Sequence, residues 1–168
     1  MIKIKFILIL LISSTFGFSQ TKNENLNFQL GEMKKFFLVG EYESFVNFVY
    51  PKVIEMAGGK SNLVKITEQS INKIKNDGFS YIDLSYKDVS EFLKKGNELQ
   101  CSIIQVIIMN TPRGKIEAEY TLIGISSDDG RNWTFIDTSG KDKETMLQYF
   151  PNLHNEIVIK PKKQKSIY

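Results

Sequence analysis

The chain contains few of the residues on which metal, redox and covalent chemistry depend. Its 168 residues include one cysteine, Cys101, and one histidine, His154. A single cysteine excludes an internal disulfide, and a single histidine excludes a metal site with several histidine ligands. A Cys–His nucleophile would require Cys101 to meet His154. Because Cys101 begins an apolar segment, we interpret it as a buried and inert thiol.

Several sequence motifs of catalysis and cofactor binding are also missing. The chain has no G-x-S-x-G nucleophile elbow, no P-loop and no dinucleotide-binding fingerprint. Glu117 and Glu119 lie on the same side of an expected strand and offer a carboxylate pair. Their neighbour Lys115 favours the simpler interpretation of an exposed strand end. The sequence therefore predicts no cofactor and no metal ion, and favours a non-enzymatic function over an enzyme.

The N-terminal 20 residues have the order of a secretory signal peptide. Lys3 and Lys5 precede an apolar run over residues 6–12, and small and polar residues follow it. The run is too short to cross a bilayer. We expect cleavage near Gln20, which leaves a secreted or periplasmic chain that begins at Thr21. A buried N-terminal helix or strand is the alternative. No cysteine follows the run, so a lipoprotein is not predicted.

Charge gives little indication of a partner. Removal of residues 1–20 leaves 20 basic and 19 acidic residues, and this balance gives no reason to propose nucleic acid. Residues 151–168 form a basic C-terminal tail with four lysines between residues 160 and 165. We expect a solvated, frayed terminus over residues 160–168. Attraction to an anionic membrane or cell wall is the alternative, which no amphipathic helix supports.

Three helices are expected in the first half of the mature chain. Residues 25–39 carry apolar residues at spacings of three and four, which indicates an amphipathic helix that ends at Gly40. Residues 41–56 continue as a second helix, in which Pro51 predicts a break near Tyr50. Ser61 is expected to cap a third helix, which ends before Gly78.

Strands are expected after Gly78. Residues 79–89 alternate and place Phe79, Tyr81 and Asp83 on one face. Residues 99–110 are apolar on both faces, which predicts a strand covered on both sides. Residues 115–126 and 132–139 supply further strands, before a short helix that stops at Pro151. Helices followed by strands predict a single α+β domain over residues 21–150, with helices on one face of an antiparallel sheet of about four strands.

The segment SSDDGRNW, residues 126–133, resembles a known turn. Ser126, Asp128, Gly130 and Trp133 fit the S-x-D-x-G-x-x-W pattern of the Asp-box, a hairpin turn of sialidase-like propellers. The pattern repeats once per blade in propellers and occurs once here, so it predicts a stable hairpin. Ligand or metal contact is the alternative, but the segment lacks the alternating ligands of a calcium loop.

The order of elements resembles the nuclear transport factor 2-like fold, which ketosteroid isomerase and scytalone dehydratase share. The likeness rests on residues 39–78, with the broken helix and the Gly-Gly-Lys turn, and on the strands that end at residues 124–137. It covers residues 25 to about 138 and implies a cone in which helices close a curved sheet. Because this fold hosts enzymes and non-enzymes, the resemblance gives no function.

The resemblance implies that the inside of the cone is the working site. The inward-pointing candidates for ligand binding are Tyr81, Asp83, Gln105 and Tyr120. In the isomerase and dehydratase branches, Asp or His bases and Tyr or Asp donors occupy the cone. No position here matches a catalytic motif of those enzymes. If the chain is such an enzyme, Asp83 is the candidate base and Tyr81 or Tyr120 the candidate donor.

We therefore expect a secreted or periplasmic, non-catalytic domain that binds a small apolar ligand or a protein partner. A second copy of the chain, packed on the open sheet as a homodimer, is one such partner. An isomerase or dehydratase is the first alternative, and a structural or interaction module of the cell envelope is the second. Neither nucleic acid nor a membrane is expected as a partner.

Overall fold

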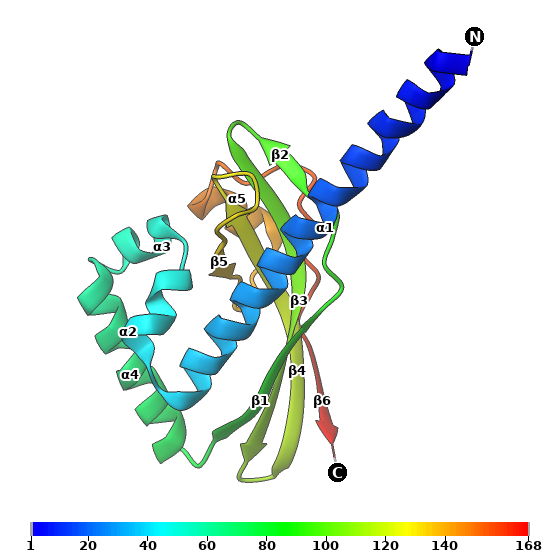
Figure 1. Ribbon diagram of the computed structural model, residues 1–168. Helices are drawn as coiled ribbons and strands as arrows, with labels where there is room; N and C mark the ends of the chain where they lie inside the picture. The colour runs from blue at the N-terminus through cyan, green and yellow to red at the C-terminus, as the bar shows by residue number, and fades with distance from the viewer. Residues whose placement is uncertain (1, 168) are drawn as a thin grey trace.

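The computed structural model describes the backbone of residues 2–167 and the side chains from Thr21 onward (Figure 1). The side chains of the expected signal peptide, residues 1–20, lie outside this description. The helical elements are α1 (Ile2–Val39), α2 (Tyr42–Phe45), a 3-10 helix (Val46–Phe48), α3 (Pro51–Met56), α4 (Lys60–Asn76) and α5 (Lys143–Tyr149). Among the described residues, no helix has both the length and the apolar character required to cross a membrane.

The strands form one antiparallel sheet. They are β1 (Ser80–Lys87), β2 (Leu93–Lys95), β3 (Glu98–Thr111), β4 (Gly114–Ser126), β5 (Thr134–Asp137) and β6 (Lys163–Ile167). The central order is β1-β3-β4-β5, while β2 also pairs with β3 and β6 also pairs with β4. The expected α+β class, with helices first, is confirmed. The expected count of about four strands is wrong, because β2 and β6 add two short strands.

The C-terminal segment packs on the domain, whereas we expected a frayed terminus. Leu153 and Ile157 are fully buried in an apolar cluster. Beyond them, β6 pairs with the first half of β4. Its lysines meet carboxylates there, and Lys165 Nζ lies 2.8 Å from Glu117 Oε1. The sheet thus supplies both hydrogen bonds and opposite charges to a segment that looks solvated in the sequence.

The helices begin and end close to the expected positions. The expected break lies at Tyr50, whose N–H donates to the Phe135 carbonyl at 2.9 Å, and Pro51 begins α3. The expected Ser61 cap is wrong, because α4 begins at Lys60 with Gly59 as its N-cap. Gly59 has a φ of 104°, a conformation that glycine adopts readily. The chain can therefore turn into α4 two residues earlier than expected.

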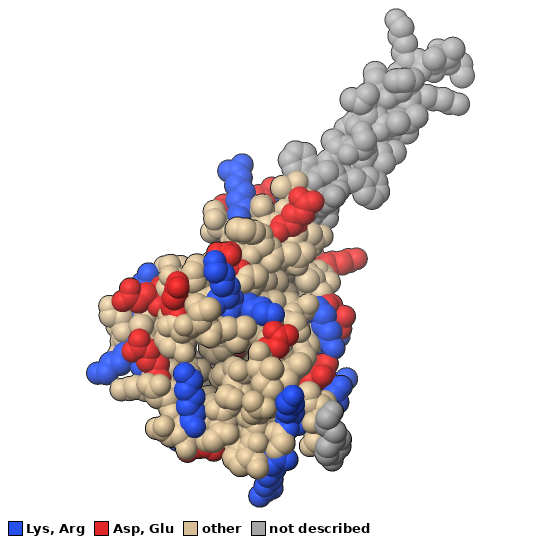
Figure 2. Space-filling model, turned by 60° about the horizontal axis from the view of Figure 1, so that its bottom comes forward, with Lys and Arg blue, Asp and Glu red and all other residues tan. Residues whose placement is uncertain are grey.

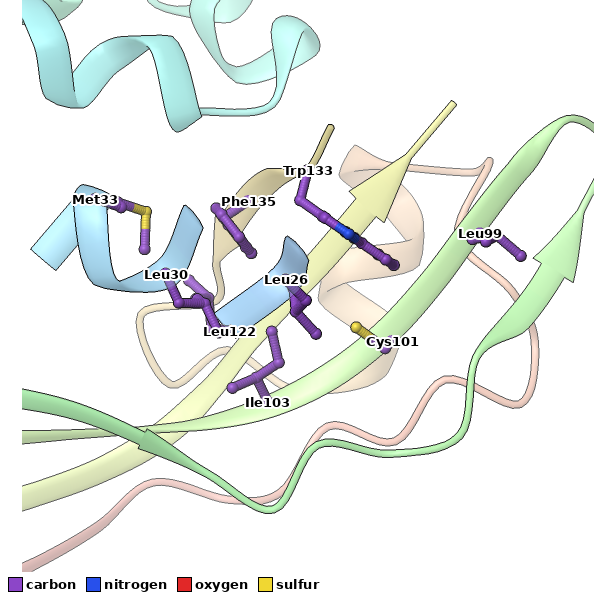
Figure 3. Packing of buried hydrophobic residues seen from close by; sticks show 9 residues of the cluster. All are labelled: Leu26, Leu30, Met33, Leu99, Cys101, Ile103, Leu122, Trp133 and Phe135. Carbon is purple, nitrogen blue, oxygen red and sulfur yellow. The ribbon is translucent and has the colours of Figure 1, made fainter. Parts of the chain in front are cut away.

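One end of the domain has a closely packed core under α1. The expected apolar stripe of α1 is confirmed, since Leu26, Leu30 and Met33 are buried against the sheet (Figure 3). Their partners on the sheet side are Leu99, Cys101, Ile103, Leu122, Trp133 and Phe135. Each fully buried Leu or Ile contributes roughly 1.5–3 kcal/mol to folding. Cys101 is buried as expected, and this burial raises the pKa of its thiol to about 12.

The opposite face of the sheet is covered by α5 and the segment after it. Ile123, Ile125 and Ile136 from β4 and β5 face away from α1 and pack against this cover. The covering residues are Met146, Phe150, Leu153 and Ile157. The run from Leu99 to Ile107 in β3 is buried throughout. The prediction of a strand covered on both sides is therefore confirmed.

Candidate functional site

A cavity of about 450 Å³ lies between the helices and the face of the sheet that α1 crosses, and it extends past the edge strand β5 to Ile136, Met146 and Phe150. Its volume falls within the range of small-molecule sites, roughly 300–1,000 Å³. The helices contribute mainly apolar walls, from Met33, Phe37, Phe45, Val53, Met56, Leu63, Met146 and Phe150. The sheet contributes apolar residues and a group of polar side chains that we call the polar cluster: Tyr81, Tyr86, Gln105, Tyr120 and Asp137.

Strand register brings the polar cluster together. Tyr86, Gln105 and Tyr120 are direct partners across β1, β3 and β4. Asp137 pairs with Leu122 on β4, two residues from Tyr120, so both side chains lie on the same face. Polar groups from four strands therefore line one wall of the cavity.

A bulge in β1 decides which of its side chains face the cavity. The register with β3 shifts between Tyr81 and Asp83 and leaves Ile82 unpaired. One extra residue reverses the alternation of faces. Tyr81 consequently lines the cavity together with Leu84 and Tyr86. Strict alternation, as assumed from the sequence, would have placed Tyr81 and Asp83 on one face.

Asp83 does not line the cavity, and its expected inward orientation is wrong. Its Oδ1 lies 2.7 Å from Lys34 Nζ on α1, and both side chains remain partly exposed. The hydrogen bond from Lys34 lowers the pKa of Asp83, and one from the Leu84 backbone adds to it. A general base requires a raised pKa and access to substrate, and Asp83 has neither.

The carboxylate that the cavity does contain is Asp137, which the sequence analysis missed. It ends β5 and lines the cavity, and its side chain remains exposed to solvent. The protein atoms around it desolvate the carboxylate and raise its pKa above the usual value. A signal was present in the sequence, because Trp133, Phe135 and Asp137 alternate and therefore share the inner face of one strand.

Hydrogen bonds hold Asp137 through one of its oxygens. The Ser139 N–H donates to Oδ1 at 2.6 Å, and the Ser139 hydroxyl lies 3.4 Å from the same atom. Oδ2 receives one long contact, 3.4 Å from Gln105 Nε2. A strong N–H···O bond is about 2.9 Å long. Oδ2 therefore keeps most of its capacity to accept a hydrogen bond.

The tyrosines of the polar cluster are neutral and available as hydrogen-bonding groups. Burial raises the pKa of Tyr81, Tyr86 and Tyr120, and the negative charge of Asp137 raises each further. All three phenols therefore keep their protons at neutral pH. The Tyr86 hydroxyl is buried and has no hydrogen-bond partner among the described residues. Such a group is usually satisfied by water or by a ligand.

Aromatic contacts fix the wall beside the polar cluster. The rings of Phe37 and Tyr81 meet edge to face, with centroids 5.0 Å apart and planes at 85°. Phe45 packs on the other side of Phe37 at 5.4 Å. Offset and edge-to-face pairs are the favoured geometries for aromatic rings. These contacts tie α1 and α2 to β1 and hold the Tyr81 ring at the cavity wall.

The turn at residues 126–133 lies elsewhere and is a hairpin connection, as expected. The Ser126 hydroxyl accepts from the Gly130 N–H at 2.9 Å, and the Trp133 indole N–H donates to the Gly130 carbonyl at 3.1 Å. Partial burial alone would raise the pKa of Asp128, but hydrogen bonds from Asn132, Ser126 and Arg131 outweigh it and lower that pKa. Its carboxylate is thus used within the turn.

The same turn holds the start of α1. Lys22 Nζ lies 2.6 Å from Asp129 Oδ1, and Asn25 donates to the Gly130 carbonyl at 3.1 Å. Gln29 binds twice: its Nε2 donates to the Arg131 carbonyl at 2.9 Å, and its Oε1 accepts from the Trp133 N–H at 2.8 Å. The turn therefore has a structural role, and we call these contacts the α1–turn clamp.

Of the four residues predicted to point inward, Tyr81, Gln105 and Tyr120 line the cavity and Asp83 does not. The arrangement can hold an apolar molecule against the helices and bond one polar end of it on the sheet. Comparison of the chain with protein-family models, with curated proteins and with solved structures finds no match.

Proposed function

We propose that the protein is exported and binds a small, largely apolar molecule in its cavity. The observation that carries this proposal is a space of about 450 Å³ with mostly apolar walls and a single polar cluster. The proposal includes a cone of the nuclear transport factor 2-like type. Its support is the order of the elements, with the cavity between the helices and one face of an antiparallel sheet.

The chemistry of the walls favours an apolar ligand. Burial of apolar ligand surface contributes roughly 25 cal/mol per Å², so a molecule that fills the cavity gains most of its affinity there. The polar cluster offers three phenols, an amide and a carboxylate along one wall, which suffice to orient one polar group. The surface is less distinctive, because positive and negative side chains are interspersed on the face in Figure 2.

Export rests on the N-terminal sequence, and the fold is compatible with it. Cleavage after Gln20 would leave Lys22, Asn25 and Gln29 in place, so the α1–turn clamp would survive. N-terminal sequencing of the product, after expression of the full chain in a bacterium, should give a start near Thr21. A product that begins at Met1 would contradict this part of the proposal.

Ligand binding is tested with the neutral, polarity-sensitive fluorophore prodan. Leu63 on α4 lines the cavity, and Leu63→Trp should fill part of it and weaken prodan binding on the order of tenfold. Ile66 lies on the same helix and is 42 % exposed, so Ile66→Trp is a matched control and should bind as the parent does. Absence of prodan binding in the parent, or equal binding in both variants, would contradict the proposal.

An enzyme that transfers a proton within the cavity is the second candidate. The observation in its favour is Asp137, a cavity carboxylate with a raised pKa beside three phenols. In this alternative, Asp137 takes the role of base that we first assigned to Asp83. Exchange of the α-protons of 2-tetralone in deuterium oxide, followed by NMR, should then be accelerated by the protein and not by Asp137→Asn. Exchange at the uncatalysed rate would rule out this activity toward such ketones.

The basic C-terminal segment gains less support as a contact for the cell envelope. Lys165 is paired with Glu117, and Lys163 is aligned with Glu119 across β4 and β6. These carboxylates neutralise part of the charge that an anionic surface would require. The cavity is therefore the better-supported working surface of the domain.

A further inference from the structure

The cavity wall carries one charge of each sign, and the two are not paired. Asp137 and Lys141 are the charged residues that line the cavity, and both side chains are exposed to solvent. The charge of Lys141 acts on Asp137 and opposes part of the rise in its pKa. Among residues 21–167, no lysine or arginine forms an ion pair with Asp137. Partial desolvation of a carboxylate without a cationic partner costs free energy. A cation supplied by a ligand would offset that cost.

The polar cluster has a free acceptor and a hydroxyl that can both donate and accept. Asp137 Oδ2 has a single contact of 3.4 Å, and the Tyr86 hydroxyl has no partner among the described residues. A protonated primary amine carries three donors and no acceptor, so it can use the two oxygens together. A ligand carbonyl can accept from the Tyr86 hydroxyl but offers no donor to Oδ2.

Aromatic rings surround the same place. The charge of Asp137 acts on Tyr81, Tyr86 and Tyr120, so all three phenols lie within its electrostatic reach. Phe37 packs edge to face on Tyr81 and holds that ring at the wall. The faces of aromatic rings attract cations, and the effect grows when the site excludes water.

We propose that the ligand is an apolar molecule with one protonated amino group, which binds between the Asp137 carboxylate and the tyrosines of the polar cluster. This proposal rests on the proposed binding function and specifies its ligand class. The apolar body of the molecule occupies the space between α1, α3, α4 and the sheet. A ligand with a carboxylate end would meet Asp137 as a like charge, and an alcohol would leave Asp137 without an ion pair.

Three naphthalenes of similar shape test the charge preference directly. They are 1-naphthylmethylamine, a cation at pH 7, 1-naphthalenemethanol, which is neutral, and 1-naphthoate, an anion. The protein is expressed as the full chain, purified in the form that the cell produces, and titrated by calorimetry. We expect the amine to bind on the order of tenfold more tightly than the alcohol, and the anion to bind most weakly.

Matched variants assign that preference to Asp137. Asp137→Asn should reduce the difference between amine and alcohol to within about threefold, because the amide keeps the shape and removes the charge. Asp83→Asn makes the same chemical change outside the cavity and should keep the preference. Tyr86→Phe removes the unpartnered hydroxyl and should weaken the amine by about threefold. Circular dichroism checks that each variant is folded.

The outcomes separate the two proposals. An amine that binds no more tightly than the alcohol overturns the amine proposal, and so does a preference that survives in folded Asp137→Asn. Either result leaves cavity binding intact when prodan still binds and Leu63→Trp weakens it. Loss of prodan binding together with all three naphthalenes overturns both proposals.

Discussion

The two ends of the helix-covered sheet face differ although they belong to the same strands. At one end, Cys101, Ile103 and Phe135 are closed over by α1. Two residues further along β3 and β5 stand Gln105 and Asp137, which face the cavity. A single step of the pleat thus separates a filled core from an open polar wall. The buried core and the proposed binding wall thus occupy adjacent rows of residues in one sheet.

Packing at the closed end leaves no free space. A Cβ atom on Gly124 would lie 3.1 Å from Cys101 Sγ and 3.4 Å from Trp133 Cε3. At the open end, by contrast, the buried Tyr86 hydroxyl has no hydrogen-bond partner among the described residues, and partial desolvation raises the pKa of the exposed Asp137 carboxylate. Substitutions at the closed end should therefore cost stability, whereas substitutions of the polar cluster should preserve or increase it.

The largest effect is expected for Trp133→Ala. The indole is 1 % exposed and donates to the Gly130 carbonyl, so its loss leaves a cavity and breaks the turn. We expect a decrease of roughly 3–5 kcal/mol in the free energy of unfolding, measured with urea. Phe28→Ala on α1 is the control, because Phe28 is 70 % exposed and should change stability by about 0.5 kcal/mol at most. Equal losses in both variants would remove the distinction between core and surface.

Gly124→Ala tests the closed end in the opposite sense, by adding an atom. The new methyl group would meet Cys101, Ile103 and Trp133 in close contact. Overpacking of this kind should lower the free energy of unfolding by about 1–3 kcal/mol. In Gly31→Ala a Cβ meets nothing within 4 Å, so this control on helix α1 should be neutral or stabilising. Unchanged stability in Gly124→Ala would show that the side chains at the closed end can shift to make room for the methyl group.

Asp137→Asn should stabilise the ligand-free protein at neutral pH. The amide oxygen can still accept from the Ser139 N–H, while the desolvated charge is removed. Asp137 is exposed and solvent screens its charge, so we expect a gain of at most about 0.5 kcal/mol, or roughly 1–2 °C in melting temperature. Differential scanning calorimetry measures it, and Asp83→Asn, which loses the Lys34 ion pair, should give no gain. A less stable Asp137→Asn would mean that the carboxylate supports the fold.

The gain in stability from Asp137→Asn should grow as the pH rises. Because folding raises the pKa of Asp137, the folded state keeps this proton to a higher pH than the unfolded state. The free energy of unfolding then falls as pH rises from the ordinary aspartate pKa through the raised one. Tyr81, Tyr86, Tyr120 and Lys141 share the cavity, but the tyrosines stay protonated there because their pKa values are raised. At pH values below the ordinary aspartate pKa, Asp137 is protonated in both the folded and the unfolded state. The gain in stability from Asp137→Asn should therefore vanish there.

Tyr86→Phe should have the smallest effect on stability. Its hydroxyl has no partner, so its removal leaves no other group unsatisfied. We expect no loss, and a gain of up to about 0.3 kcal/mol in the free energy of unfolding by urea. A loss above that size would indicate that the hydroxyl has a partner in solution. Together with the amine titrations, this variant shows whether the Tyr86 hydroxyl contributes to ligand binding or to the stability of the fold.

The sequence correctly predicted those elements in which a single pattern of apolar residues continues along the whole element. The stripe of Leu26, Leu30 and Met33 follows the helical repeat, and it was correct. The alternation in β1 failed at Ile82, because the bulge depends on the register with β3 and leaves no mark in the local sequence. Asp83 was therefore placed on the wrong face.

Contacts between distant segments account for the other errors. The lysines of β6 look solvated until the carboxylates of β4 are placed beside them. Asp137 was detectable from its alternation with Trp133 and Phe135, but its raised pKa depends on protein atoms that several elements bring around it. Sequence reasoning thus found three residues of the cavity wall and missed the carboxylate between them.

The α1–turn clamp has a consequence for the order of folding. Lys22 and Asp129 are 107 residues apart in the chain, and Gln29 and Trp133 are 104 apart. Contacts of such long range form late, since the entropy of loop closure must be overcome before they stabilise anything. Helix α1 is synthesised first, but its apolar stripe is covered only after the hairpin has formed. Until Trp133 has been synthesised, the nascent chain presents Leu26, Leu30 and Met33 to chaperones.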